Sequence, residues 1–509
     1  MDCKITNFEV TTNEVCLSQT AEIPIETDLT VSEKNDDIKR ILKCIITPYI
    51  SSKQTNSNML TIEGAANITV IFLGADGLIY SESNDVPFKK SFESTKEIDG
   101  GHINIRTNTV INYCRDITER KIGIKAYIKV DVRITNPKKS EIVSDIDCKN
   151  FETLKGNINV SKSISREEKS VIIDEELNIP QNLPAIDRII RRNAKAQITE
   201  TKALNGKVIV KGNLSIVVIY CDADNAMQKF SSVLPFNQII DMPDITEECE
   251  CDSSVEICSL NISPRTDQSG NVTSIMIVSK LNITSNAVCT GEVPMIFDAY
   301  STKYKSNIEM NSIKFTRIAK QVDETFLCKK RISANGNVID SILDFWCDLT
   351  SCSTKFSENT MTVFGSLTIG AIITDPNGII DCFDRIIDFE YPVELNESLS
   401  SPFATPMIDV QNLNYSLIGN GEIDVKLELK VAVTVYNADS KSLITSAEVT
   451  DEKIESDDPS SLIAYFAEKG ENIWEISKKF LANRNEFLEL NGITESVVES
   501  PKMLLIPRM

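Results

Sequence analysis

Long stretches of the chain alternate apolar and polar residues with a period of two. Between Ile122 and Ile134, every second residue is isoleucine, valine or alanine, and most residues between them are charged. The same pattern returns from Ile423 to Val433 and, less regularly, near Ile275 to Ile283. Successive side chains of a strand point to opposite faces, so this alternation predicts long strands with one face on a core and one in water. We expect a mainly β protein with antiparallel, sandwich-like units.

An internal repeat divides the chain into three copies. Each copy starts with a short apolar motif and places a glycine 26 residues after its first isoleucine, in the pairs Ile38 and Gly64, Ile186 and Gly212, and Ile339 and Gly365. A turn residue follows 12 residues after each glycine, at Asp76, Asp224 and Asn377. An aromatic residue follows after 12 more, at Phe88, Phe236 and Phe389. Four landmarks in the same register three times establish the repeat.

Each copy is expected to open with a short helical turn (residues 37–42, 185–190 and 338–343). Two strands joined near an asparagine or glycine would follow, and then a strand that ends in the aromatic. The run from Val208 to Tyr220 is rich in β-branched residues, as strands are. Asp76-Gly77 and Asn377-Gly378 supply residues that tolerate positive φ in hairpin turns. The glycine inside the strand indicates a bulge or a close backbone approach.

These patterns predict β domains at residues 1–146, 147–300 and 301–446. Residues 447–460 are acidic and lack aromatic side chains, so a solvated linker is expected there. Residues 461–509 differ in character. A short strand, a helix capped by Asn472, a second helix and a last strand predict a small βααβ unit.

The chain has 509 residues, a formal net charge of -21 and a sequence pI near 4.7. This charge disfavours nucleic acid and anionic lipid, and it fits a basic protein partner or plain solubility. The first residues lack a positive segment followed by an apolar run, and no apolar stretch is long enough to cross a bilayer, so we expect a cytosolic protein. The fourteen cysteines are scattered, which predicts small buried hydrophobes without disulfides.

No constellation of residues predicts catalysis. His102 is the single histidine, and no glycine-rich loop precedes a Lys-Ser or Lys-Thr pair. Cys249, Cys251 and Cys258 cluster, and Cys347 lies near Cys352, but zinc sites use two tight pairs or added histidines. We therefore predict no enzyme activity, no cofactor and no metal site.

Two segments resemble known families. Leu183 to Ile190, Gly206 to Gly212 and Leu234 to Phe236 resemble the SPOCS domain of spore-coat-associated proteins from clostridia and their relatives. The tail resembles the LysM domain through Tyr465, Gly470, Ile473, Trp474, Leu490, Asn491, Ile506 and Pro507. The combination is similar to the SipL-type family of spore-coat morphogenetic proteins.

This resemblance implies a non-enzymatic scaffold in the mother cell, at the forespore surface. Its LysM domain would bind a SpoIVA-like morphogenetic ATPase of the coat basal layer, and possible further partners are other coat proteins. LysM domains also bind N-acetylglucosamine polymers beside their first helix, so peptidoglycan or cortex glycan is the alternative ligand.

The candidate contact residues in the tail are Ile463, Trp474, Lys478 and Lys479. Trp474 follows a helix cap, where a large ring tends to stay partly exposed, and Ile463 stands at the open start of a strand. The two lysines occupy the polar side of the helix and could pair with acidic partner residues. The alternative is that Trp474 and Ile463 pack the small core of the unit, since anchors and core aromatics look alike in sequence.

Overall fold

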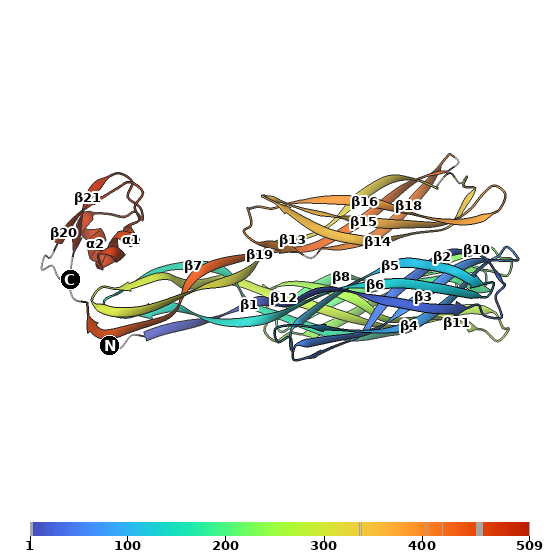
Figure 1. Ribbon diagram of the computed structural model, residues 1–509, viewed down its shortest axis with the longest axis horizontal. Coiled ribbons are helices and arrows are strands. Elements are labelled where there is room, and N and C mark those ends of the chain that lie inside the picture. Colours follow the sequence, from blue (N-terminus) through green and yellow to red (C-terminus); the bar gives the residue numbers. More distant parts are fainter. Residues whose placement is uncertain are drawn as a thin grey trace.

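The computed structural model describes residues 4–334, 336, 338–404, 406–419, 421–454 and 462–507. Strands account for most of these residues, and two short helices lie near the C-terminus (Figure 1). The mainly β, antiparallel fold class predicted from the alternation is confirmed. Within the described ranges, no helix has the length and apolar character needed to cross a membrane.

The first repeat consists of two three-stranded antiparallel sheets. One has the order β1-β6-β5 and the other the order β2-β3-β4. The strands are β1 (Lys4–Thr30), β2 (Ile38–Asn56), β3 (Met59–Gly74), β4 (Ile79–Glu93), β5 (His102–Thr118) and β6 (Lys121–Asp147). One apolar core contains residues from both sheets, as in a sandwich.

The second repeat has the same two sheets, with the orders β11-β12-β7 and β10-β9-β8. Its strands are β7 (Phe151–Asn178), β8 (Arg188–Leu204), β9 (Lys207–Cys221), β10 (Met227–Asp241), β11 (Glu250–Thr266) and β12 (Val272–Ser301). The third repeat pairs a β14-β15-β16 sheet with a sheet in which β13, β17 and β18 all pair with β19. Its strands are β13 (Tyr304–Ser333), β14 (Ser341–Ser357), β15 (Thr360–Thr374), β16 (Ile380–Glu394), β17 (Pro402–Ala404), β18 (Met407–Ile418) and β19 (Glu422–Lys453).

The alternating runs form the central strands of the longer sheets. In β6, the alternate residues from Ile122 to Ile134 are all buried, and those from Ile423 to Val433 in β19 are buried in the same way. Each of these strands is therefore flanked on both edges and covered on one face.

The predicted helical turns at the start of each repeat are wrong, because none of these residues is helical and strands begin at Ile38, Arg188 and Ser341. Ile38 already pairs with Gly74, and β-bulges follow between Ile38 and Arg40 and between Ile41 and Lys43. The other two repeats have a bulge at the same place in β8 and β14. A bulge adds a residue to one strand, so the apolar spacing locally changes from two to three and resembles that of a helix.

The repeat glycine and the repeat aromatic face each other across adjacent strands. Gly64 pairs with Phe88, and the other two copies pair Gly212 with Phe236 and Gly365 with Phe389. A Cβ on Gly64 would lie 2.7 Å from the Phe88 ring, and the other copies show a similarly close approach. The ring covers the space that a side chain would fill, so the close backbone approach expected for this glycine is its structural role.

The three repeats also pack against one another through equivalent residues. Ile71, Ile219 and Ile372, each seven residues after its repeat glycine, belong to one buried cluster. A second contact region involves β6, β12 and β19, where two buried clusters each contain residues of all three repeats. Each repeat thus contacts the other two, and the body of the molecule is a pseudo-threefold assembly within one chain.

A buried ion pair joins the second and third repeats. Arg191 and Asp344 occupy equivalent positions, five residues after Ile186 and Ile339. Two hydrogen bonds of 2.7 and 2.9 Å link the guanidinium to the carboxylate, and the side chains are 7% and 3% exposed. The Arg191 guanidinium also lies 5.0 Å from the ring centre of Trp346.

Two further expectations need correction. Cys249 and Cys289 form a disulfide, because Glu250 pairs with Val288 and brings these neighbouring cysteines opposite each other at the end of the β11–β12 pairing. Cys148 is also disulfide-bonded. In the predicted linker, residues 447–453 belong to β19, where the continuing pairing with β13 overrides the acidic composition. Residues 455–460 of that linker lie outside the described residues.

Candidate protein-binding site

The C-terminal module consists of β20 (Leu462–Ala467), α1 (Ile473–Lys479), α2 (Arg484–Asn491) and β21 (Lys502–Pro507), in the predicted βααβ order. β20 and β21 form an antiparallel pair. The Asn472 side chain caps α1 by accepting a hydrogen bond from the Trp474 amide at 2.8 Å, as the sequence predicted. Gly492 ends α2 in the left-handed conformation. Nine buried apolar residues form the module core.

Trp474 is not one of these core residues, although only 3% of it is exposed. Its indole Nε1 donates a 2.8 Å hydrogen bond to the Asp298 carboxylate, and its ring centre lies 5.1 Å from that of Tyr300. Both partners belong to β12 of the second repeat. The expectation of a partly exposed ring is therefore wrong, and so is the alternative of packing in the module core: the second repeat buries this side chain.

Lys478 joins Trp474 in this contact. Its Nζ lies 2.7 Å from each carboxylate oxygen of Asp298. Tyr300 donates a 2.8 Å hydrogen bond from its hydroxyl to the Ala482 carbonyl, between α1 and α2. Burial raises the pKa of Tyr300, which keeps this hydroxyl protonated as a donor. The sequence did not predict Asp298 and Tyr300 as site residues, because nothing in the local pattern connects them to a helix more than 170 residues away.

The other two predicted site residues lie elsewhere on the module. The ammonium of Lys479 is exposed and lies 5.0 Å from the ring centre of Tyr465 in β20. Ile463 is half-buried against the module core and pairs with Ile506. The structure thus brings Trp474 and Lys478 together against the second repeat, whereas Lys479 and Ile463 remain on the β20 side.

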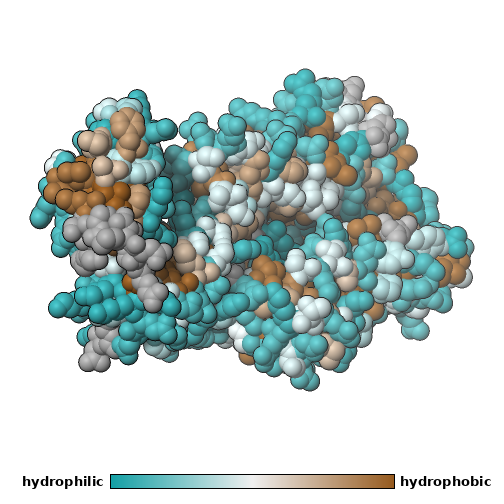
Figure 2. Space-filling model, turned by 60° about the vertical axis from the view of Figure 1, so that its left-hand side comes forward, coloured by the Kyte–Doolittle hydropathy of each residue, from teal (hydrophilic) through white to brown (hydrophobic). Residues whose placement is uncertain are grey.

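The module has a second surface feature on the outer face of its two-stranded sheet. Phe466 pairs with Met503, and both are 67% exposed. Further exposed apolar side chains in the module are Leu462, Leu490 and Leu505. Figure 2 shows apolar side chains gathered on this module, in contrast to the mostly hydrophilic surface around it. The sequence already indicated an apolar outer face here, because residues 462–467 contain no charged residue on either face of the strand.

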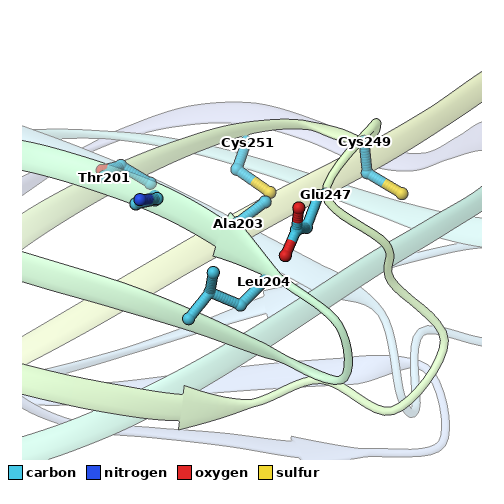
Figure 3. Close-up of a pocket in the computed structure, with 7 residues that line it drawn as sticks. Thr201, Ala203, Leu204, Glu247, Cys249 and Cys251 are labelled. Carbon is cyan, nitrogen blue, oxygen red and sulfur yellow. The ribbon is translucent and has the colours of Figure 1, made fainter.

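A pocket of about 380 Å³ in the second repeat contains part of the cysteine cluster noted in the sequence. Thr201, Ala203, Leu204, Glu247, Cys249 and Cys251 line it (Figure 3). Cys249 is in the disulfide, and burial, with a smaller effect of Asp252, raises the pKa of Cys251 to about 11. A protonated thiol is a poor metal ligand and a poor nucleophile. Among the described residues, no three His, Cys, Asp or Glu side chains are grouped to hold a metal ion.

The fold is that of a mainly β protein built from three copies of one two-sheet unit and a small βααβ module. The family model described as "SipL, SPOCS domain" matches residues 37–115 and 185–264. These ranges cover β2 to most of β5 in the first repeat and β8 to most of β11 in the second. Two of the three repeats therefore match the SPOCS domain, which confirms this part of the sequence resemblance, is consistent with a SipL-like SPOCS protein and suggests a sporulation-related function. No curated protein and no solved structure matches the chain.

Proposed function

We propose that this protein is a non-enzymatic morphogenetic scaffold for spore coat assembly. The observation that carries the proposal is the SPOCS match in two repeats that pack, with a third, into one body. SPOCS is not a known enzyme family. We also propose that the three sheet pairs are separate domains, close to 1–146, 147–300 and 301–446, and that the scaffold works in the mother cell at the forespore surface.

The C-terminal module is the proposed partner-binding unit. Its βααβ order and its sequence resemble LysM, and its first helix carries Trp474 and two lysines in its last turn. We propose that its partner is a SpoIVA-like ATPase of the coat basal layer. The proposed contact residues are Trp474, Lys478, Lys479 and Ile463, which lie on α1 and on the adjacent strand β20.

The test is a pull-down with the immobilised full-length protein. One arm offers a purified SpoIVA-like ATPase and the other offers purified peptidoglycan. Capture of the ATPase without retention of glycan supports the proposal. Retention of glycan with no ATPase captured would refute it in favour of a glycan-binding LysM protein.

Two variants that each introduce a glutamate locate the surface. Lys479→Glu changes the α1 side, and Met503→Glu changes the outer sheet face. Both positions are exposed, so neither substitution buries a charge. We expect Lys479→Glu to weaken ATPase capture and Met503→Glu to leave it near the wild-type level. The reverse result would move the contact to the apolar sheet face.

A further inference from the structure

The contact between α1 and β12 has the chemistry of a ligand in a receptor. The Asp298 side chain is 15% exposed. Its carboxylate accepts hydrogen bonds from the Trp474 indole at 2.8 Å, from the Lys478 ammonium at 2.7 Å and from the Ala299 amide at 2.9 Å. A carboxylate removed from water needs a cation and several donors, and this one has both.

Most of these donors come from the module. Trp474 and Lys478 are four residues apart, so they lie on the same side of α1. Together they supply an N–H dipole and a positive charge to a single carboxylate. Tyr300 completes the contact by placing its ring against Trp474 and its hydroxyl on the Ala482 carbonyl. The module therefore recognises an acidic side chain together with an aromatic one.

Only the second repeat supplies this pair. Ile142, Met295 and Leu443 are equivalent residues of the three repeats, and all three belong to one buried cluster between the repeats. Counting on from these residues, Asp298 and Tyr300 correspond to Asp145 and Asp147 in the first repeat and to Ser446 and Glu448 in the third. An aromatic side chain two residues after the acid is present in the second repeat alone.

We propose that the α1 face of the C-terminal module is a carboxylate receptor that the protein's own second repeat occupies with Asp298. A protein partner binds the same face by presenting an acidic side chain beside an aromatic ring, in place of Asp298 and Tyr300. The docked module and the partner-bound module are then mutually exclusive. This inference rests on the proposed function for the partner, while the internal docking can be tested without any partner.

The first experiment measures docking alone. Asp298→Asn keeps the shape of the side chain and removes the charge that faces Lys478. The matched control is Glu292→Gln, an exposed position on the same strand that also loses one negative charge. Hydrogen exchange of residues 473–479 in the full-length protein should become at least about tenfold faster in Asp298→Asn and stay unchanged in Glu292→Gln. Unchanged exchange in Asp298→Asn would overturn the proposal.

The second experiment tests the recognition chemistry. A synthetic peptide of residues 292–302 carries Asp298 and Tyr300 and is offered to the full-length Asp298→Asn protein. The opened α1 face should bind this peptide, whereas the closed wild-type protein should bind it at least about tenfold more weakly. A control peptide with asparagine at position 298 should not bind. Equal binding of the two peptides would refute a carboxylate receptor.

The third experiment tests exclusivity with the SpoIVA-like ATPase. Removing the internal competitor should tighten ATPase binding by about tenfold in Asp298→Asn, and not in Glu292→Gln. Wild-type affinity in a variant that has undocked by hydrogen exchange would overturn the shared site and leave the proposed function intact. If the ATPase binds none of the proteins, the proposed function fails, and the exchange and peptide results still decide the receptor.

Discussion

The buried ion pair between Arg191 and Asp344 offers the sharpest test of how the repeats are held together. Arg191→Met removes the charge and keeps a side chain of similar length. The carboxylate of Asp344, only 3% exposed, then loses both hydrogen bonds from the guanidinium. Removing one member of a buried pair costs about 3–5 kcal/mol, because the remaining charge is neither solvated nor paired. We expect a loss of this size in the free energy of unfolding.

The double variant Arg191→Met with Asp344→Leu separates this explanation from a simple loss of packing. Both charges are then gone, so most of the stability should return. The comparison pair is Lys211 and Glu200, which is equally close at 2.8 Å but has both side chains 48% exposed. Lys211→Met should therefore cost less than about 1 kcal/mol.

The assay is urea unfolding of the full-length protein, followed by tryptophan fluorescence. One of the two tryptophans, Trp346, lies against the Arg191 guanidinium, and the other is Trp474. The midpoints of the four proteins are compared under the same conditions. A loss below about 1 kcal/mol in Arg191→Met, or a double variant no more stable than Arg191→Met, would refute the reasoning.

Three further predictions concern single repeats. Burial, together with the nearby charge of Arg166, lowers the pKa of His102 to about 4, below its unfolded value of about 6.5. As the pH falls, the unfolded chain therefore binds the proton first. The contribution of neutral His102 to the free energy of unfolding is fully present above pH 6.5 and falls by about 2 kcal/mol towards pH 4, allowing for partial exposure. His102→Gln should flatten this part of the pH profile of thermal unfolding. Gly212→Ala would push a Cβ against the Phe236 ring and should cost at least about 2 kcal/mol in urea unfolding, and a cost near zero would contradict the close approach. Cys249→Ser should cost about 4 kcal/mol for the 40-residue separation that the disulfide closes. A reductant should lower the stability of the wild-type protein more than that of the variant, which keeps the disulfide of Cys148.

Much of the fold could be predicted because its signals are local. Strict alternation identified β6 and β19, and the repeat register located Gly64 opposite Phe88 before any pairing was known. The helical turns were wrong for an equally local reason. A bulge changes the apolar spacing, and a single sequence does not distinguish that change from a helical period.

The contacts between distant segments could not be predicted in this way. The Cys249–Cys289 disulfide depends on how β11 and β12 pair, and scattered cysteines give no sign of that pairing. Trp474 was predicted to contact a separate partner, and nothing in the sequence indicated that it bonds Asp298 of the second repeat, 176 residues earlier. Such pairs depend on how folded units pack against one another. The apolar–polar pattern of a single strand carries no information about that packing.

The pseudo-threefold body has a consequence for how such a protein can change. A trimer of separate identical chains would carry any substitution three times and would form only at sufficient concentration. Here the three copies are covalently linked, so their assembly is independent of concentration and each copy can vary alone. The residues at the centre, such as Ile71, Ile219 and Ile372, have stayed alike, whereas the position of Tyr300 is occupied by aspartate or glutamate in the other copies. One copy could thus acquire a specialised contact without disturbing the other two.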